Sequence, residues 1–195
     1  MAPGNPLKLK NLLADIRGCQ LCKDLIPEPN PVLRVSSSAR ILIVGQAPGT
    51  KVHASGTPWD DASGKRLRAW MNIRDETFYD VSRVAIVPMG FCYPGKGKSG
   101  DLPPRPECAV QWHQQLMAHL VNVRCTLLIG QYAQNYYLKD SHRSLTDRVA
   151  NWRALAPKTY VLPHPSPRNQ IWLKRNSWFE EEVVPHLQGS LRSLL

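Results

Sequence analysis

Four short runs of apolar residues constrain the fold of this chain most. ILIV occupies positions 41–44, and comparable runs stand within 81–91, 124–130 and 159–163. A continuous apolar run of this length is typical of a parallel strand that is covered on both faces. Segments with helical spacing separate the runs, so strands and helices alternate along the chain. The sequence therefore predicts an α/β fold with a mostly parallel sheet.

The segments around these strands have the spacing of helices. In the N-terminal segment, Leu9, Leu12, Leu13 and Ile16 fall on one helical face. The 195 residues contain no internal repeat and no evident linker, so we expect a single domain over 1–195. Further helices are expected at 63–73, at 109–123, from 131 onward and within 177–195, the last interrupted at Pro185.

Three loops follow predicted strands: GQAPG at 45–49, GFCYPGKGKSG at 90–100 and PHPSPRN at 163–169. Ligands of parallel sheets bind at the carboxyl ends of the strands, so we expect a site where these loops meet. In the last loop two prolines flank Ser166, and each restricts its own φ and the residue before it. Such a stiff loop suits ligand binding, although a rigid turn alone has the same pattern.

The chain carries a net charge of +10, from 25 Lys and Arg against 15 Asp and Glu. The basic residues are spread along the sequence, which favours a groove on a folded surface over a disordered basic tail. This charge indicates nucleic acid or another polyanion as the partner, although a solvated basic face has the same composition. No apolar run is long enough for a transmembrane helix, and the N-terminus lacks the apolar core of a signal peptide. We therefore expect a cytoplasmic protein with no membrane partner.

Four of the five cysteines form two groups that suit a metal site. Cys19 and Cys22 form a C-x-x-C motif, and Cys92 and Cys108 flank the Gly- and Pro-rich loop. Four thiolates in such groups can close a tetrahedral zinc site or hold an iron–sulfur cluster, and unrelated buried cysteines are the alternative. Either centre would link the N-terminal segment to the lysine-rich loop. Cys125 lies in an apolar run and is expected to be a buried structural thiol.

In combination, GQAPG, GTPWDDASG, the cysteine after the second strand and HPSPRN resemble the uracil-DNA glycosylase superfamily. The four cysteine positions are similar to those of its family 4, the iron–sulfur branch. The resemblance runs from about Cys19 to about Asn176, most of the chain. It implies a flavodoxin-like, three-layer α/β/α fold around a central four-stranded, mostly parallel sheet. It also implies a four-iron four-sulfur (4Fe-4S) cluster, rather than zinc, on Cys19, Cys22, Cys92 and Cys108.

The resemblance assigns roles in the excision of a base that has been extruded from DNA. The first motif would line the base pocket and position the attacking water. Trp59 would stack on the extruded base, a contact worth roughly 1–3 kcal/mol, although a core tryptophan is the alternative. His164 would stabilise the charge on the departing base, although a satisfied surface histidine is the alternative. The base-binding residues would be Gly45, Gln46, Ala47, Pro48, Gly49 and Asn169, and the DNA contacts Ser166, Pro167, Arg168, Lys96, Lys98, Lys174 and Arg175.

The first motif departs from the family 4 pattern at its second position. Family 4 usually has a glutamate there that activates water, whereas this chain has Gln46. An amide positions water but cannot take its proton. The nearby D-x-S-G sequence, beginning at Asp61, is similar to a family 5 loop in which the aspartate is the base. We therefore predict Asp61 as the catalytic base with Asp60 second, and the alternative is that the two aspartates only cap a helix.

The base-reading position departs from the pattern as well. Family 4 has an asparagine there, whereas the aligned residue here is Pro88, which has no side-chain amide. A backbone amide, Gln46 or Asn169 would then read the base, or the base is not uracil. Loss of a matched hydrogen-bonding group weakens discrimination, so a modified or damaged pyrimidine is a real alternative to uracil.

These residues predict a monofunctional DNA glycosylase that acts as a monomer and leaves an abasic site. No motif places a lysine for Schiff-base chemistry, so the enzyme is not expected to cleave the strand. One alternative is excision of a bulky modified cytosine, such as glucosylated hydroxymethylcytosine, from phage DNA in anti-phage defence. A second is an iron–sulfur module that binds a damaged base without cutting, and a third is a redox or metal sensor that uses the C-x-x-C motif.

Overall fold

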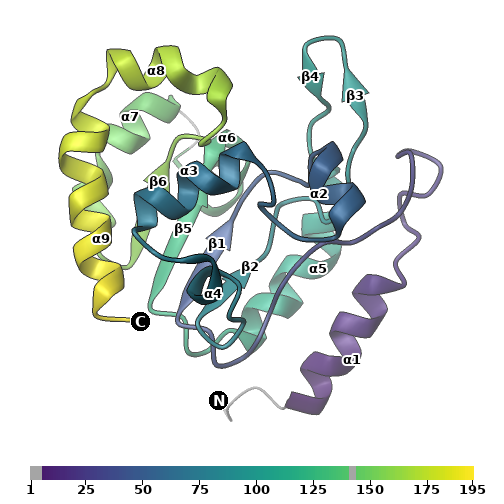
Figure 1. Ribbon diagram of the computed structural model, residues 1–195. Helices are drawn as coiled ribbons and strands as arrows, with labels where there is room; N and C mark the ends of the chain where they lie inside the picture. The colour runs from purple at the N-terminus through teal and green to yellow at the C-terminus, as the bar shows by residue number, and fades with distance from the viewer. Residues whose placement is uncertain (1–5, 141–143) are drawn as a thin grey trace.

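Four parallel strands form the central sheet of this computed structural model, which describes residues 6–140 and 144–195 (Figure 1). β1 lies between β2 and β5, so that Ile41 is opposite both Val84 and Cys125. Helices flank the sheet, and the α/β fold expected from the sequence is confirmed. The strands are β1 (Ile41–Val44), β2 (Val84–Ile86), β5 (Cys125–Ile129) and β6 (Thr159–Leu162), in the order β2-β1-β5-β6.

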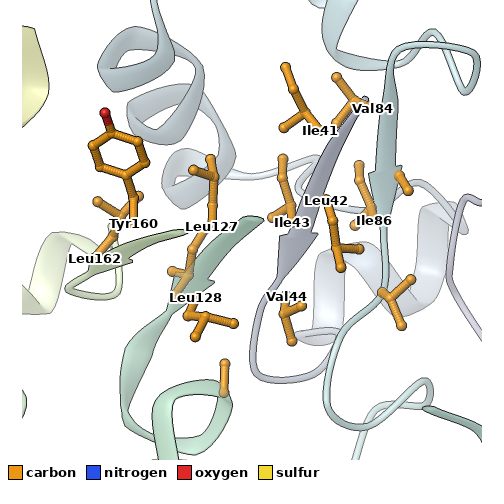
Figure 2. Packing of buried hydrophobic residues seen from close by; sticks show 14 of the residues in the cluster. Ile41, Leu42, Ile43, Val44, Val84, Ile86, Leu127, Leu128, Tyr160 and Leu162 are labelled. Atoms are coloured by element: carbon orange, nitrogen blue, oxygen red, sulfur yellow. The ribbon is translucent and has the colours of Figure 1, made fainter. Parts of the chain in front are cut away.

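Side chains on the strands form the centre of the hydrophobic core (Figure 2). Ile41, Ile43, Leu127 and Tyr160 have no exposed surface. Cys125 is equally buried, as expected for a structural thiol. Burial of each large apolar side chain contributes about 1.5–3 kcal/mol relative to exposure. This packing holds the strand ends, and therefore the loops that follow them, in fixed positions.

The expected helices are present, although some begin earlier than expected. α1 (Pro6–Arg17) packs against α5 (Pro106–His119), which begins at a proline because the first helical turn needs no N–H there. α3 (Ala62–Met71) and α6 (Gly130–Tyr137) occupy two further expected segments. Several helices are too short for an apolar face to repeat, so periodicity did not predict them. They are α2 (Thr50–Ser55), α4 (Asp75–Phe78), α7 (Leu145–Ala150) and α8 (Gln170–Arg175), which follows the HPSPRN loop.

The C-terminal helical region is irregular just before Pro185. A π-helical turn at Phe179–Val183 leads into α9 (Val184–Arg192), in which Pro185 lies in the first turn. Proline has no N–H and its ring crowds the preceding turn, so the helix widens there instead of continuing regularly. The expected interruption therefore takes the form of a wide turn rather than a break.

The loop expected at 92–108 contains a small hairpin that the sequence did not predict. β3 (Lys96–Gly97) pairs antiparallel with β4 (Gly100–Asp101), and the hairpin projects from the body of the molecule (Figure 1). Gly100 has a φ of 145°, which favours glycine, and this explains part of the loop's composition. Within the described residues, no helix has the length and apolar character needed to cross a membrane.

Candidate active site

A cavity of about 640 Å³ lies at the carboxyl edge of the sheet, where loops from all four strands meet. Its walls include the first motif after β1, the hairpin segment 99–102 and His164 after β6. The structure thus brings together the three loops that the sequence singled out. Gln131 and Tyr132, at the start of α6 after β5, supply a fourth wall. Sequence reasoning missed this wall because its short GQY sequence carries no recognisable motif.

All five residues of the first motif line the cavity, and their backbone is held by the chain that follows β2. The carbonyl of Gly45 accepts a hydrogen bond from the Met89 N–H at 2.9 Å. The carbonyl of Gln46 accepts one from the Gly90 N–H at 3.0 Å. The motif is therefore fixed by main-chain contacts, and the half-buried side chain of Gln46 belongs to the cavity wall.

Trp59 forms one side of the cavity in an unusual backbone conformation. Its φ is 60°, a value rare for a bulky residue, and Arg68 donates a hydrogen bond to its carbonyl at 3.2 Å. Its ring lies 5.6 Å from that of His164, at 32°. Two glycines make room for it, because a methyl group on Gly45 would lie 2.8 Å from the indole and one on Gly64 would lie 1.7 Å from the Trp59 carbonyl oxygen. Trp59 is half-buried against the core, so it is both a packed side chain and a cavity wall.

We expect Gly45→Ala to destabilise the protein by about 1–3 kcal/mol, because the added methyl group forces the Trp59 ring to move. Urea unfolding followed by tryptophan fluorescence measures the effect. The matched control is Gly189→Ala in α9, where a methyl group meets open space. Unchanged stability of Gly45→Ala would contradict the tight contact between Gly45 and Trp59.

Asp61 lines the cavity and also caps α3. Its Oδ1 accepts a hydrogen bond from the Gly64 N–H at 2.7 Å, so the capping role considered as the alternative is real. Capping uses one carboxylate oxygen, and a carboxylate has two, so it leaves the group able to accept a proton. Asp60 differs because it is exposed to solvent and lies outside the cavity wall. Of the two adjacent aspartates, Asp61 is the one positioned to act in the cavity.

His164 presents a hydrogen-bond donor to the cavity. Its Nδ1 accepts from the Ser166 N–H at 3.2 Å, which leaves the proton of the neutral ring on Nε2. Burial lowers the pKa of His164, and the nearby Asp61 carboxylate opposes this effect in part. The ring is therefore neutral at pH 7, with the Nε2–H available to an acceptor in the cavity.

Hydrogen bonds within and around the HPSPRN loop hold its shape. The Asn169 side-chain amide donates to the His164 carbonyl at 2.7 Å. The Ser166 hydroxyl accepts from the Arg168 N–H at 3.2 Å and begins a short 3-10 turn, Pro167–Asn169. Arg66 donates to the Ser166 carbonyl at 3.2 Å, which ties the loop to α3. Asn169 thus braces the histidine through its amide nitrogen, besides lining the cavity.

Arg168 connects two walls of the cavity. Its Nη1 donates to the Ser99 carbonyl at 3.2 Å, in the turn of the β3–β4 hairpin. A methyl group on Gly100 would lie 2.4 Å from this nitrogen, so a larger residue there would displace the end of the Arg168 side chain. A guanidinium has five N–H donors, so the contact leaves others for a phosphate. The predicted DNA contact at Arg168 therefore lies next to a hairpin that the same side chain holds in place.

Pro88 lines the cavity above a buried histidine. The Pro88 carbonyl accepts a hydrogen bond from His113 Nε2 at 3.0 Å, and His113 Nδ1 accepts one from the Tyr137 hydroxyl at 2.8 Å. Burial lowers the pKa of His113 to about 4, which keeps the ring neutral. The side chain of Pro88 offers no hydrogen bond to a base, and its carbonyl already accepts one from His113.

The low pKa of His113 predicts that the protein loses stability in acid. Above pH 6.5 the ring is neutral in both states, whereas between about pH 6.5 and 4 only the unfolded chain takes up the proton. The free energy of unfolding should therefore fall by roughly 2–4 kcal/mol over this interval because of His113. Urea titrations at several pH values measure this loss, and His113→Gln should reduce the slope. An equal slope in both proteins would contradict the assignment.

The four lysine and arginine residues that were predicted as further DNA contacts lie at the surface, outside the cavity wall. Lys96 and Lys98 are exposed on the hairpin, whose segment 99–102 lines the cavity. Lys174 and Arg175 are exposed at the end of α8, which follows the HPSPRN loop. The hairpin therefore borders the cavity, whereas α8 only follows a loop that does, and a role of both pairs in phosphate binding stays a prediction. Pro167, which was predicted with them, is exposed in the loop itself.

The four cysteines predicted as ligands all line the same cavity, a second and smaller one. It lies between the segment after α1 and the start of α5. Burial, with a smaller contribution from the neighbouring thiols, raises the pKa of Cys92 to about 11 and that of Cys108 to about 12. Among the described residues, no three Cys, His, Asp or Glu side chains are arranged to hold one metal ion. Four thiolates on one zinc ion must converge within about 2.3 Å of it, whereas a cluster spreads its ligands over several irons. The structure thus brings the four predicted ligands to one cavity, and the group that they would hold stays a prediction.

Comparison with protein families gives a match over most of the chain. The family model described as the Uracil DNA glycosylase superfamily matches residues 34–188. This range includes β1 to β6, the cavity loops that follow the four strands of the central sheet, and Cys92 and Cys108. Cys19 and Cys22 precede the matched range.

Proposed function

Because the chain belongs to the uracil DNA glycosylase superfamily, we propose that it is a monofunctional glycosylase of uracil or a modified pyrimidine in DNA. Members of this superfamily are typically DNA glycosylases, which hydrolyse the N-glycosidic bond of a base. The observation that carries the proposal is the pairing of Asp61 and His164 in one cavity, where burial lowers the pKa of the imidazole and the nearby carboxylate opposes this effect only in part. One group can take a proton and the other can donate a hydrogen bond, which are the two functions that hydrolysis of this bond needs.

The proposed reaction begins with a nucleotide turned out of the helix into the larger cavity, against Trp59. Gln46 holds a water, Asp61 accepts its proton, and the water oxygen bonds to the anomeric carbon of the sugar. The bond between sugar and base breaks, and its electron pair leaves with the base. The Nε2–H of His164 donates a hydrogen bond to the base as this negative charge develops. The products are the free base, after protonation, and an abasic site.

Uracil is the first candidate base, and a modified cytosine is the alternative. Pro88 leaves the reading of the base edge to other wall groups, of which Gln46, Gln131 and Asp101 offer hydrogen bonds. A cavity of about 640 Å³ also has room for a substituted pyrimidine. If the base is a bulky cytosine, such as glucosylated hydroxymethylcytosine, the enzyme would act against modified phage DNA.

Excision on labelled oligonucleotides tests the proposal. The panel contains uracil opposite guanine and adenine, uracil in single strands, hypoxanthine, and hydroxymethylated and glucosylated cytosines. Alkali then cleaves the strand at each abasic site. Release of one base from this panel is expected, with no cleavage before alkali. Tight binding to a modified base without any abasic product would instead support a binding module in which Gln46 has replaced the catalytic glutamate.

We propose that Cys19, Cys22, Cys92 and Cys108 hold a 4Fe-4S cluster in the smaller cavity. The support is their shared cavity together with the resemblance to family 4. When bound, the cluster would supply a cross-link between the N-terminal segment and the loops after β2, away from the reacting base. Iron and sulfide analysis of protein purified without oxygen tests this, and Cys108→Ser should lose most of the iron. Protein that cannot be loaded with iron and sulfide would reject the cluster without affecting the glycosylase proposal.

A further inference from the structure

N–H groups surround the thiols of the smaller cavity. The Phe91 N–H donates to Cys108 Sγ at 3.3 Å. The backbone of Asn30 donates a hydrogen bond to Cys92, which lowers the pKa of that thiol against the effect of burial. Arg105, which is also paired with Glu107, donates one to Cys22. The Cys108 sulfur therefore has an N–H partner at 3.3 Å, and N–H groups also lie beside Cys92 and Cys22.

Trp112 brings a further N–H to this cavity. It lies one helical turn after Cys108 on α5, so the two side chains are on the same face of the helix, and both line the cavity. Its indole Nε1 is buried, and it has no hydrogen-bond partner among the described residues. A buried N–H without an acceptor costs about 1–3 kcal/mol, and such groups are rare in native proteins.

The other walls of the cavity do not explain this N–H. They include apolar side chains such as Leu21, Ile26 and Phe91. A filled site would bring further acceptors, its sulfurs, into this cavity. Thiolates and inorganic sulfides carry negative charge, and hydrogen bonds to charged groups are about twice as strong as neutral ones.

We propose that the indole N–H of Trp112 donates a hydrogen bond to a sulfur of the bound cluster and makes the cluster easier to reduce. The proposal rests on the cluster proposed above. Reduction adds negative charge to the sulfurs, so a donor stabilises the reduced form more than the oxidised form and raises the reduction potential. Trp112 is thus a positioning residue for the cofactor, outside the cavity in which the base is excised.

The test is the reduction potential of the cluster in the full chain, purified without oxygen, compared with that of Trp112→Phe. Phenylalanine keeps the aromatic packing and removes only the N–H. We expect the reduction equilibrium to shift about tenfold toward the oxidised form, which is about 59 mV for one electron. Trp178→Phe is the matched control, because Trp178 packs against Trp172 and not at the cysteine cavity. An equal potential in wild type and Trp112→Phe, with equal iron content, would overturn the proposal.

A second measurement covers the case in which Trp112→Phe does not take up iron. Wild-type protein with ¹⁵N-labelled indoles is reduced and studied by pulsed electron paramagnetic resonance. We expect a magnetic coupling between the cluster and one indole nitrogen. The Trp178→Phe variant should show the same coupling. Its absence overturns the proposal. A wild-type protein that holds no iron or sulfide after reconstitution overturns both this inference and the cluster, whereas the oligonucleotide panel judges the glycosylase function separately.

Discussion

Asp61→Asn should reduce base excision by about 10²–10⁴-fold while the protein remains folded. Asparagine is as good a helix cap as aspartate, and its carbonyl oxygen can still accept the hydrogen bond from the Gly64 N–H. Its amide cannot take a proton from water. The substitution therefore separates the two roles that the structure gives to Asp61. Single-turnover excision of the base identified on the oligonucleotide panel measures the catalytic role, and urea unfolding measures the capping role.

Asp60→Asn is the matched control for this experiment. The two aspartates are adjacent, but Asp60 is exposed and lies outside the cavity wall, so its variant should excise at nearly the wild-type rate. A large loss at Asp60 with little loss at Asp61 would reverse the assignment of the base. Full activity in both variants would show that neither aspartate is the base and would point to a group other than these two carboxylates.

The sheet could be predicted from the sequence because its strands are nearly all apolar. Segments such as 41–44 have to be buried on both faces, and burial on both faces is the situation of parallel strands between helices. The same argument predicted that the loops after these strands lie close together, because the carboxyl ends of parallel strands share one edge of the sheet. The cavity residues named from the motifs accordingly lie close together in space.

Other parts of the site depend on contacts between segments distant in sequence, which no local pattern records. The need for glycine at position 45 comes from the Trp59 ring, and at position 100 the neighbour is the end of the Arg168 side chain. The hairpin of β3 and β4 is too short to leave a periodic signal. The partner of the Pro88 carbonyl is His113, which belongs to the next helix. Such pairs become visible only when the tertiary structure sets the distances.

His164→Ala should reduce excision by about 10²–10³-fold, the loss typical of one donor removed from a developing negative charge. The neutral ring matters here, because the Ser166 N–H fixes the tautomer that directs Nε2–H toward the cavity. Burial lowers the pKa of His164 below its usual value of about 6.5, so this form persists at neutral pH and somewhat below it. Single-turnover rates at pH 7, compared with those of wild type, measure the loss.

The control for His164 is His119→Ala, which removes a histidine from the end of α5, outside the larger cavity. This variant should keep its excision rate, which separates a general effect of histidine loss from an effect at the site. Binding of the same oligonucleotide gives a second distinction, because a donor that acts mainly on the departing base changes the rate much more than the affinity. If His164→Ala lost affinity and rate in equal proportion, the ring would serve to hold the base through its contact with Trp59 rather than to stabilise its departure.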